Sequence, residues 1–375
     1  MFIKGVGMTK FGISDKLSHQ LAYDASLDAL QDADMKFDEI DAIVVSNMEF
    51  FQSVEKQRHF ASLMSSMFRT NKPIIRVPAA CSGGGAAFWL ANQFDFDNIL
   101  VVAAEKLMTM KSEYITDEFM MGAETRYEQD DGLIFPSQNA LVAQEYFLKY
   151  PETNLDHLSL IAFKNHNNAF LNPKAKFFQT KVSLEKIKSS PVVCSPLRLF
   201  DCSISVDGAS AAVITKDKTD INVIGSDLQT DFLPTFERED NTTWDATTNS
   251  ARNAYSEAGM GASDVDISEI HDAFTIVELV AYEDLGFAKP GESYKKIEDG
   301  YFELDGKLPV NTSGGLKAKG HPVSATGVAQ IYELVKQLRN ECGDRQVNNA
   351  KIGLAQNIGG AGGTITCNIV KKVSG

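Results

Sequence analysis

The sequence predicts an α/β fold made of two related halves, with sheets covered by helices. Three observations support this prediction: strand-like apolar runs alternate with helical segments, one segment of the first half recurs in the second, and each half contains a strand, a glycine-rich turn and a helix in succession. A chain of 375 residues is also longer than one hydrophobic core usually supports. We therefore expect two halves rather than one compact unit.

The recurring segment is predicted to form a helix, a short loop and a strand. Its two copies are residues 29–35 with 38–41 and residues 254–260 with 263–266. In each copy, alanines lie about one helical turn apart, and an acidic-apolar turn leads into a predicted strand, at residues 42–45 and 267–270. A repeat of this kind indicates one supersecondary unit built twice.

A strand, a glycine-rich turn and a helix follow each copy. We predict them at residues 74–78, 81–85 and 86–94 in the first half and at residues 308–311, 313–322 and 325–338 in the second. Further strands are expected at residues 99–104, 352–355 and 364–370. Because sites of α/β proteins lie at strand ends, we expect the chemistry at the two glycine-rich turns.

The first half carries residues that the second half lacks. Between about residues 105 and 195 the chain has no counterpart in the repeat and contains several methionines and phenylalanines. We predict an N-terminal half at residues 1–216, which includes this inserted lobe, and a C-terminal half at residues 217–375. The lobe is expected to lie over the active site, and its aromatic residues form its core or line a pocket.

The charge balance argues against nucleic acid and membrane partners. The chain has 36 Lys and Arg against 50 Asp and Glu, a formal net charge of −14, and its basic groups, such as residues 371–372, are no longer than pairs. No apolar run approaches the ~18 residues of a membrane span. Neither a leader peptide nor a Ser-Lys-Leu ending is present, so we expect a cytoplasmic protein.

Five widely separated cysteines fit neither a disulfide framework nor a metal site. They are Cys81, Cys194, Cys202, Cys342 and Cys367, with no C-x-x-C pair and no Cys/His cluster at ligand spacing. Cys81 differs from the others because a strand ends and a helix begins around it, followed by residues too small to shield it. Since a helix N-terminus stabilises a thiolate, we predict an anionic nucleophile; the alternative is a buried cysteine beside a turn.

Two histidines of the second half are the candidate partners of Cys81. His321 lies in the glycine-rich segment 311–322, and His271 follows the strand predicted at residues 267–270. Either histidine alone would more often be a satisfied core residue. Together, at strand ends and with Cys81 in the matching turn of the repeat, they favour catalysis.

Residues 357–363 form another glycine-dense segment, after the strand expected to end at Ala355. They lack the G-x-G-x-x-G spacing of dinucleotide sites and lead into a strand instead of a helix. Backbone N–H groups here could stabilise a developing oxyanion. The alternative is a β-bulge or a simple turn.

In combination, these motifs resemble the thiolase superfamily, and most closely its sterol-carrier-protein-type and archaeal acetyl-CoA acetyltransferase branch. The matching segments are residues 77–84, 164–166, 172–173, 201–209, 271–274, 320–322 and 357–363, which span nearly the whole chain. The resemblance implies a five-layered αβαβα fold of two pseudo-symmetric halves with an inserted loop domain. It also implies a homodimer or a homotetramer.

Carried over residue by residue, the resemblance implies that Cys81 takes the acyl group. His321 would activate Cys81 and line one oxyanion hole, which His271 would complete. The N–H groups of Cys81 and Gly359 would form the second hole. Further substrate-binding candidates are His166, Lys317, Asn357 and Gly360. Cys202 matches a structural segment of the family and is assigned to the core.

The implied reaction is a Claisen condensation of two acyl-CoA molecules through an acyl-enzyme, reversible to thiolysis. Coenzyme A thioesters are the substrates, acetoacetyl-CoA or a similar 3-ketoacyl-CoA is the product, and no cofactor is bound. Most relatives carry a second cysteine as general base at the position of Asn357 or, in sterol-carrier-type members, of Ala273. Since this chain has neither, the base must be another residue, a histidine or a cysteine such as Cys194 or Cys367.

The missing base leaves two other functions open. A decarboxylating enzyme of the ketoacyl-synthase type also uses a cysteine and two histidines, and it needs no base because loss of CO2 generates the carbanion. A thiolase-fold subunit could instead bind acyl-CoA or scaffold a partner without turnover. Steroid side-chain aldolases of this fold dispense with the nucleophile, and the presence of Cys81 argues against that variant. The order of the motifs favours the thiolase.

The resemblance also implies partners. Archaeal relatives are associated with the mevalonate pathway and pass acetoacetyl-CoA to a hydroxymethylglutaryl-CoA synthase through a small zinc-containing OB-fold protein. Because the chain is acidic, the phosphates of CoA need a local basic patch, which Lys317 and Lys319 or the insertion could supply.

Overall fold

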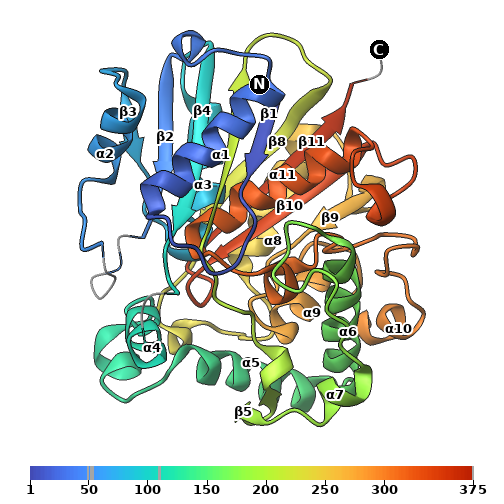
Figure 1. Ribbon diagram of the computed structural model, residues 1–375. Coiled ribbons are helices and arrows are strands. Elements are labelled where there is room, and N and C mark those ends of the chain that lie inside the picture. Colours follow the sequence, from blue (N-terminus) through green and yellow to red (C-terminus); the bar gives the residue numbers. More distant parts are fainter. Residues whose placement is uncertain (49, 51–54, 109–110, 374–375) are drawn as a thin grey trace.

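The computed structural model describes residues 1–48, 50, 55–108 and 111–373. A layered body of strands and helices carries a mainly helical lobe at one end (Figure 1). Its strands are β1 (Phe2–Met8), β2 (Ala42–Ser46), β3 (Ile74–Arg76), β4 (Asn98–Glu105), β5 (Val192–Cys194), β6 (Leu197–Arg198), β7 (Gly208–Thr215), β8 (Ile221–Thr230), β9 (Ile267–Glu269), β10 (Ile352–Gly359) and β11 (Thr364–Lys372).

The helices lie on both faces of the strands and in the lobe (Figure 1). They are α1 (Ser18–Asp32), α2 (Phe60–Phe68), α3 (Gly83–Gln93), α4 (Ser112–Met120), α5 (Phe135–Lys149), α6 (Leu155–Leu171), α7 (Leu184–Lys188), α8 (Asp245–Ala258), α9 (Thr275–Asp284), α10 (Ser293–Glu298) and α11 (Thr326–Leu338). Within the described ranges, no helix is long and apolar enough to cross a membrane.

The strand order repeats between the two halves. The main sheet runs β3-β2-β4-β7-β1-β8-β11-β10-β9. β2 pairs in parallel with β3 and β4, and β9 pairs in parallel with β10, while Ser268 bridges Val310 on its other side. Antiparallel pairs follow in both parts, β4 with β7 and β7 with β1, then β10 with β11 and β11 with β8. The two predicted pseudo-symmetric halves are therefore confirmed.

Five layers follow from where the apolar side chains point. Along β4, Leu100 and Val102 pack toward α1 and α2, whereas Ile99 and Val101 pack toward α3 and α11. A third cluster lies between the second part of the sheet and α8 and α9. Each of the two parts of the sheet thus has helices on both faces, and α3 and α11 lie between the two parts, which confirms the αβαβα prediction.

The predicted insertion is the helical lobe. It contains α4 to α7 and the β5/β6 hairpin, at the lower end of the molecule in Figure 1. Asp207, just before β7, connects the beginning of the lobe to the body. The N–H groups of Leu107 and Met108 donate to Asp207 Oδ1, both at 2.8 Å, and Lys106 forms a 2.8 Å ion pair with Asp207 Oδ2. The motif around Asp207 is therefore structural.

Three predicted elements differ from the structure. α3 begins at Gly83 and not at residue 86. The glycines can form its first turn because the N–H groups of a first turn need no acceptor within the helix. β10 continues to Gly359 because Asn357 still pairs with Thr366 of β11. Residues 308–311 form a single bridge and not a strand, since Pro309 has no N–H to donate. The boundary at residue 216 stays a prediction and falls between β7 and β8.

Helix α1 lies so close to β1 that position 7 requires glycine. A Cβ on Gly7 would lie 2.1 Å from Ala25 O and 2.5 Å from Ala29 N, and both are backbone atoms. We expect Gly7→Ala to lower the free energy of unfolding by about 2 kcal/mol, measured by urea denaturation, because helix and strand must separate. Gly12→Ala is the control, since nothing lies within 4 Å of its Cβ. Equal stability of the two variants would contradict this close approach.

Candidate active site

Cys81 lies in the turn that joins β3 to α3. It belongs to a short 3₁₀ helix, Ala80–Ser82, directly before α3. Ala80 has a φ of 49°, in the left-handed region that side chains rarely adopt, and strain of this kind is often found at functional sites. A Cβ on Gly84 would lie 2.4 Å from Ser324 O, so this turn packs directly on the second half of the chain.

His321 comes from the second half and is fixed on both sides. Its N–H donates to Ile204 O at 2.8 Å, and its Nδ1 lies 2.7 Å from Thr326 Oγ1. Gly320, with a φ of 119°, makes this possible because a Cβ there would lie 2.7 Å from Val206. The imidazole is therefore held rigidly, with Nδ1 occupied by the threonine hydroxyl.

His271 follows β9 and faces β10. Its backbone N–H donates to Gln356 Oε1 at 3.0 Å, and its Nδ1 lies 3.1 Å from Asn357 Nδ2. The rings of His271 and His321 are nearly perpendicular, with centroids 5.4 Å apart. Both predicted histidines thus meet at one point.

The three predicted catalytic side chains converge. One ligand atom from each of Cys81, His271 and His321 lies within 4.8 Å of the other two. All three side chains are buried, with 9%, 2% and 4% of their surface exposed. They come from both halves of the chain, so only the folded protein brings them together. A thiol and two imidazoles are also donors that zinc accepts, although the cavity described next favours a reaction site.

A cavity of about 690 Å³ opens in front of Cys81 and His321. Its walls are mostly apolar, and the lobe supplies one of them through Ile115 and Phe119 of α4 and Phe135 of α5. This volume lies in the range of sites for small organic ligands. The expected position of the insertion over the site is therefore confirmed.

The ionisable groups of the cluster are neutral in the free protein. Burial, together with the charge of Glu105, raises the pKa of the Cys81 thiol to about 12, although N–H groups of Gly360 and Cys81 partly oppose this shift. Burial and then the charge of Lys319 lower the pKa of His321 to about 3, and burial followed by the charge of His321 lowers that of His271 well below its usual value. The predicted resting thiolate is therefore wrong, because removal from water outweighs the helix N-terminus.

Glu105, at the end of β4, is a buried acid beside Cys81 that sequence analysis missed. It accepts hydrogen bonds from Ser324 Oγ at 2.6 Å, Asn47 Nδ2 at 3.1 Å and Met48 N at 3.2 Å. Burial raises its pKa to about 8. Glu105 thus connects the ends of β2 and β4 with the segment that follows His321. A lone acid at a strand end gives no sequence signal for this role.

The raised pKa of Glu105 makes stability depend on pH. Between about pH 4.5 and pH 8 the unfolded chain has lost this proton while the folded protein keeps it, so folding becomes less favourable as pH rises. We expect the difference in unfolding free energy between wild type and Glu105→Gln to fall by about 1.4 kcal/mol per pH unit in this window and to level off outside it. Urea denaturation at several pH values measures this difference. A flat difference would show that Glu105 is ionised in the folded state.

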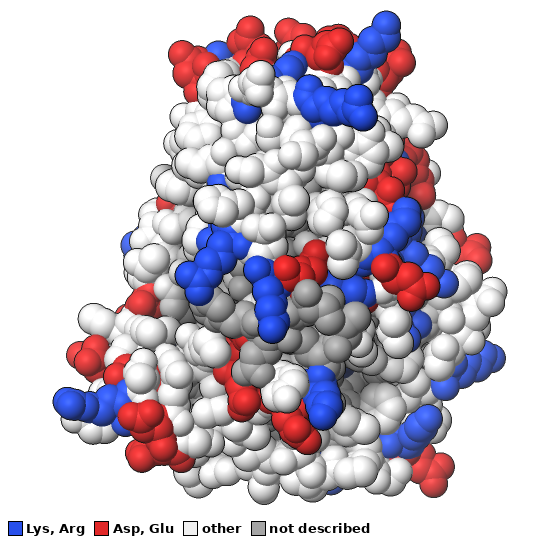
Figure 2. Space-filling model, turned by 60° about the vertical axis from the view of Figure 1, so that its left-hand side comes forward, with Lys and Arg blue, Asp and Glu red and all other residues white. Residues whose placement is uncertain are grey.

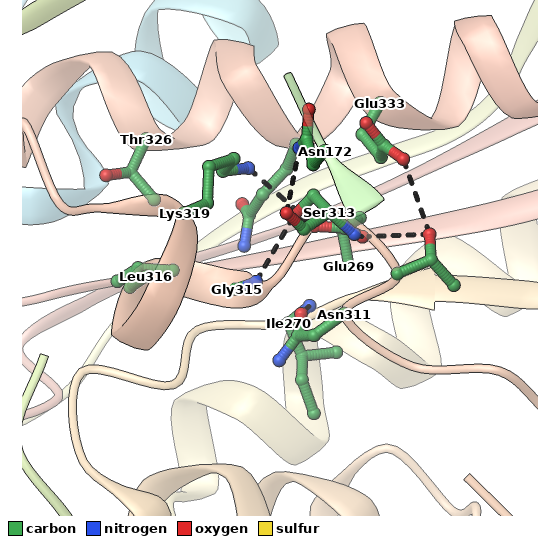
Figure 3. Close-up of polar contacts among 12 residues, drawn as sticks. Asn172, Glu269, Ile270, Asn311, Ser313, Gly315, Leu316, Lys319, Thr326 and Glu333 are labelled. Atoms are coloured by element: carbon green, nitrogen blue, oxygen red, sulfur yellow. Dashed lines mark hydrogen bonds and ion pairs between the residues drawn. The ribbon is translucent and has the colours of Figure 1, made fainter. Parts of the chain in front are cut away.

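The predicted basic patch at Lys317 and Lys319 is wrong. Both side chains are only 1% exposed, so no phosphate in solvent reaches them. Lys317 Nζ donates to Phe200 O at 2.8 Å, and Lys319 Nζ lies 3.8 Å from Glu269. Figure 3 shows Lys319 pointing toward Glu269 and Ser313, whose N–H donates to the same carboxylate at 3.0 Å. These lysines therefore hold the segment that carries His321.

The remaining candidates divide between cavity and core. His166 is 2% exposed and packs against the rings of Phe177 and Phe200, so the structure does not bring it to the described walls of the cavity. Gly360 lines the cavity, and its N–H is the one from this loop that faces the sulfur of Cys81. Gly359 instead packs on the turn, where a Cβ would lie 2.6 Å from Ala79 O. This loop therefore presents the N–H of Gly360 to the sulfur of Cys81.

Cys202 packs against the hydrophobic core, as predicted, and it also lines the cavity, which was not predicted. The N–H of its neighbour Ser203 donates to Ala273 O at 2.8 Å, so Cys202 lies close to Ala273. Cys194 and Cys367, by contrast, do not belong to the described walls of the cavity. Cys202 bridges Phe274, a residue distant in sequence, and for this reason the linear pattern gave no signal.

Charge is sparse inside the cavity and mixed outside it. Among the described residues that line the cavity, Glu118 is the charged one, and none is Lys or Arg. On the face shown in Figure 2, basic and acidic side chains are interspersed. The charged groups of a ligand would therefore lie outside the apolar cavity, with its apolar end inside.

The chain is similar to known proteins along nearly its whole length. Residues 231–372 match the model for the thiolase C-terminal domain-like family. The chain is 38% identical to an acetyl-CoA acetyltransferase of Methanothermobacter thermautotrophicus over 98% of both chains, and 31% identical to sterol carrier protein 2 of Bos taurus over 99% of this chain and 72% of that protein. It has the fold of the Ltp2-ChsH2(DUF35) aldolase, with a TM-score of 0.82, 22% identity, and 99% and 97% of the two chains covered.

Proposed function

The chain belongs to the thiolase family, and on that basis we propose that it is an acetyl-CoA C-acetyltransferase. It joins two acetyl-CoA molecules into acetoacetyl-CoA, or similar acyl-CoA molecules into a 3-ketoacyl-CoA, and it also runs in the direction of thiolysis. The observation that carries this proposal is the meeting of Cys81, His271 and His321 within 4.8 Å, where Cys81 and His321 line an apolar cavity. Coenzyme A thioesters are the substrates.

In the first half-reaction the acetyl group moves to Cys81. As the sulfur attacks the thioester carbon, His321 takes the thiol proton and then gives it to the departing CoA sulfur. Because Cys81 and His321 are both neutral in the free site, attack and proton transfer are expected to occur together. We assign stabilisation of the tetrahedral oxyanion to the N–H groups of Cys81 and Gly360, because both face the Cys81 sulfur.

In the second half-reaction a second acetyl-CoA loses a methyl proton and attacks the stored acetyl group. We assign this proton to His321, which later returns it to the Cys81 sulfur when the product leaves. His271 stabilises the enolate oxygen as a hydrogen-bond donor. One imidazole thus handles both proton transfers, and Cys202 is the competing base because it also lines the cavity.

Incubation of the purified protein with acetyl-CoA tests the proposal. We expect acetoacetyl-CoA and free CoA as products, and intact-protein mass spectrometry should show one acetyl group, located on Cys81. Product from malonyl-CoA alone, with release of CO2, would favour the decarboxylating enzyme. An unmodified protein and no product with either substrate would favour a non-catalytic acyl-CoA-binding subunit.

We also propose that the protein works in an assembly in the cytoplasm. β3 is the edge strand of the sheet, and Ile75 on it is 45% exposed, which suits a homodimer or homotetramer formed through this edge. The similar fold in a complex named for a DUF35 protein supports an association with a partner protein. We propose a small zinc/OB-fold protein as this partner, and a hydroxymethylglutaryl-CoA synthase of the mevalonate pathway as the enzyme that consumes the product. Native mass spectrometry of the protein alone and with such partners measures these associations.

A further inference from the structure

We propose that Asn357 is a positioning residue that fixes the tautomer of His271, so that His271 carries its proton on Nε2 and acts as a permanent hydrogen-bond donor. This inference rests on the proposed function, in which His271 stabilises the enolate. It gives a purpose to the amide that stands where many relatives carry a cysteine. Asn357 itself need not contact substrate.

The orientation of the Asn357 amide follows from a backbone group. The N–H of Gly85 lies 3.3 Å from Asn357 Oδ1, and a backbone N–H can only donate. Oδ1 is therefore the acceptor, and Nδ2 is the end that faces His271. Gly85 is in the first turn of α3, where N–H groups have no acceptor within the helix, so Asn357 also caps this helix from a distant strand.

The amide orientation determines where the proton of His271 lies. Asn357 Nδ2 is 3.1 Å from His271 Nδ1, and an amide NH2 can only donate, so Nδ1 must accept and carries no proton. Burial keeps the pKa of His271 well below its usual value, so the ring is neutral and its one proton is on Nε2. Nε2 is then the nitrogen that remains to donate to a substrate oxygen.

The surroundings are shaped to admit the amide. A Cβ on Gly327, in the first turn of α11, would lie 2.4 Å from Asn357 Oδ1, and one on Gly85 would lie 3.0 Å from it. Asn357 is 1% exposed, so water does not compete for these hydrogen bonds. The first turns of α3 and α11 thus each have a glycine next to the Asn357 side chain.

Few charged groups disturb His271. The ionisable groups that face it are His321 and Cys81. Its chain neighbours Glu269 and Asp272 direct their carboxylates elsewhere, Glu269 to Ser313 and Asp272 to the N–H groups of Leu316 and Lys317. The amide of Asn357 is therefore the group that selects the tautomer.

The direct test is nitrogen-15 NMR of the wild-type protein with labelled histidine. The chain has six histidines, and His271→Gln assigns the signal. We expect a protonated Nε2 and an unprotonated Nδ1. A signal showing the proton on Nδ1 would overturn the proposal, whatever the activity of the enzyme. Absence of acetoacetyl-CoA formation would instead count against the proposed function and leave this tautomer result standing.

The second test is Asn357→Asp, which keeps the acceptor for Gly85 and replaces the donor by a carboxylate. The carboxylate attracts the proton to Nδ1 and raises the pKa of His271. At low pH the imidazolium still donates from Nε2, whereas at higher pH the neutral ring loses that donor. We expect kcat and kcat/KM to fall together by about 100-fold above the new pKa of His271. The pH–rate profile of the variant then falls at high pH, which the wild-type profile does not.

Asn92→Asp is the matched control, because it makes the same exchange on α3, where Asn92 Nδ2 donates to Phe88 O at 2.8 Å. It should leave the pH profile unchanged. Loss of activity in Asn357→Asp with the proton still on Nε2 would reduce Asn357 to a structural cap. Full activity at all pH values with the proton moved to Nδ1 would show that the tautomer does not matter, and either result overturns the positioning role.

Discussion

Cys81→Ala is expected to lower kcat for acetoacetyl-CoA formation by at least about 1,000-fold, because the variant lacks the thiol that is proposed to take the acetyl group. The variant should fold, since Cys81 lies against a few apolar neighbours, Phe50, Leu107 and Val323, that an alanine also contacts. Mass spectrometry after incubation with acetyl-CoA should show no acetyl adduct, and a coupled assay of CoA release measures the rate.

Cys342→Ala is the matched control for this substitution. Cys342 is also a buried cysteine with a pKa raised by burial, and it lies outside the described walls of the cavity. It should retain the adduct and most of the activity. An acetyl adduct that persists in Cys81→Ala would place the nucleophile elsewhere and contradict the proposed mechanism.

His321→Gln is expected to slow both half-reactions, each by about 1,000-fold, because one imidazole is proposed to carry both protons. Glutamine retains a polar side chain of similar reach and can still donate a hydrogen bond, but it cannot accept a proton at neutral pH. The first half-reaction is measured as the burst of CoA release, and the second as exchange of methyl hydrogens of the thioester in deuterated water.

Measuring the half-reactions separately distinguishes His321 from Cys202. With His321 as the base, Cys202→Ala should keep the burst of CoA release and the hydrogen exchange. If Cys202 is the base, Cys202→Ala will form the acetyl-enzyme at the normal rate and lose hydrogen exchange. Normal exchange in His321→Gln would likewise show that the second proton goes to another group.

The sequence was sufficient for the regular elements and for the catalytic cluster because both leave local signals. The strands at residues 42–46 and 98–105 are buried on both faces, so they are continuous apolar runs. Cys81 and His321 lie in matching glycine-rich turns of the repeat, and the repeat places those turns at equivalent positions of the two halves. Their meeting follows from the topology.

What the sequence did not reveal depends on partners distant along the chain. Lys319 resembles a surface residue in a glycine-rich loop, and only the fold brings Glu269 against it. The thiol of Cys81 was expected to ionise because its helix was visible in the sequence, whereas the extent of its burial was not. Asn357 appeared as a missing cysteine, and its hydrogen bonds to Gly85 and His271 need three separate segments.

The apolar lining of the cavity determines how long the acetyl-enzyme survives. A thioester to cysteine is hydrolysed once water reaches its carbonyl, and hydrolysis would turn a transferase into a wasteful thioesterase. The site is surrounded by apolar surface that binds water poorly, from Phe119 and Phe135 of the lobe and Phe274 of the body. The acetyl-enzyme therefore persists until a second CoA thioester binds. The lobe thus decides how the intermediate is partitioned between carbon–carbon bond formation and loss to solvent.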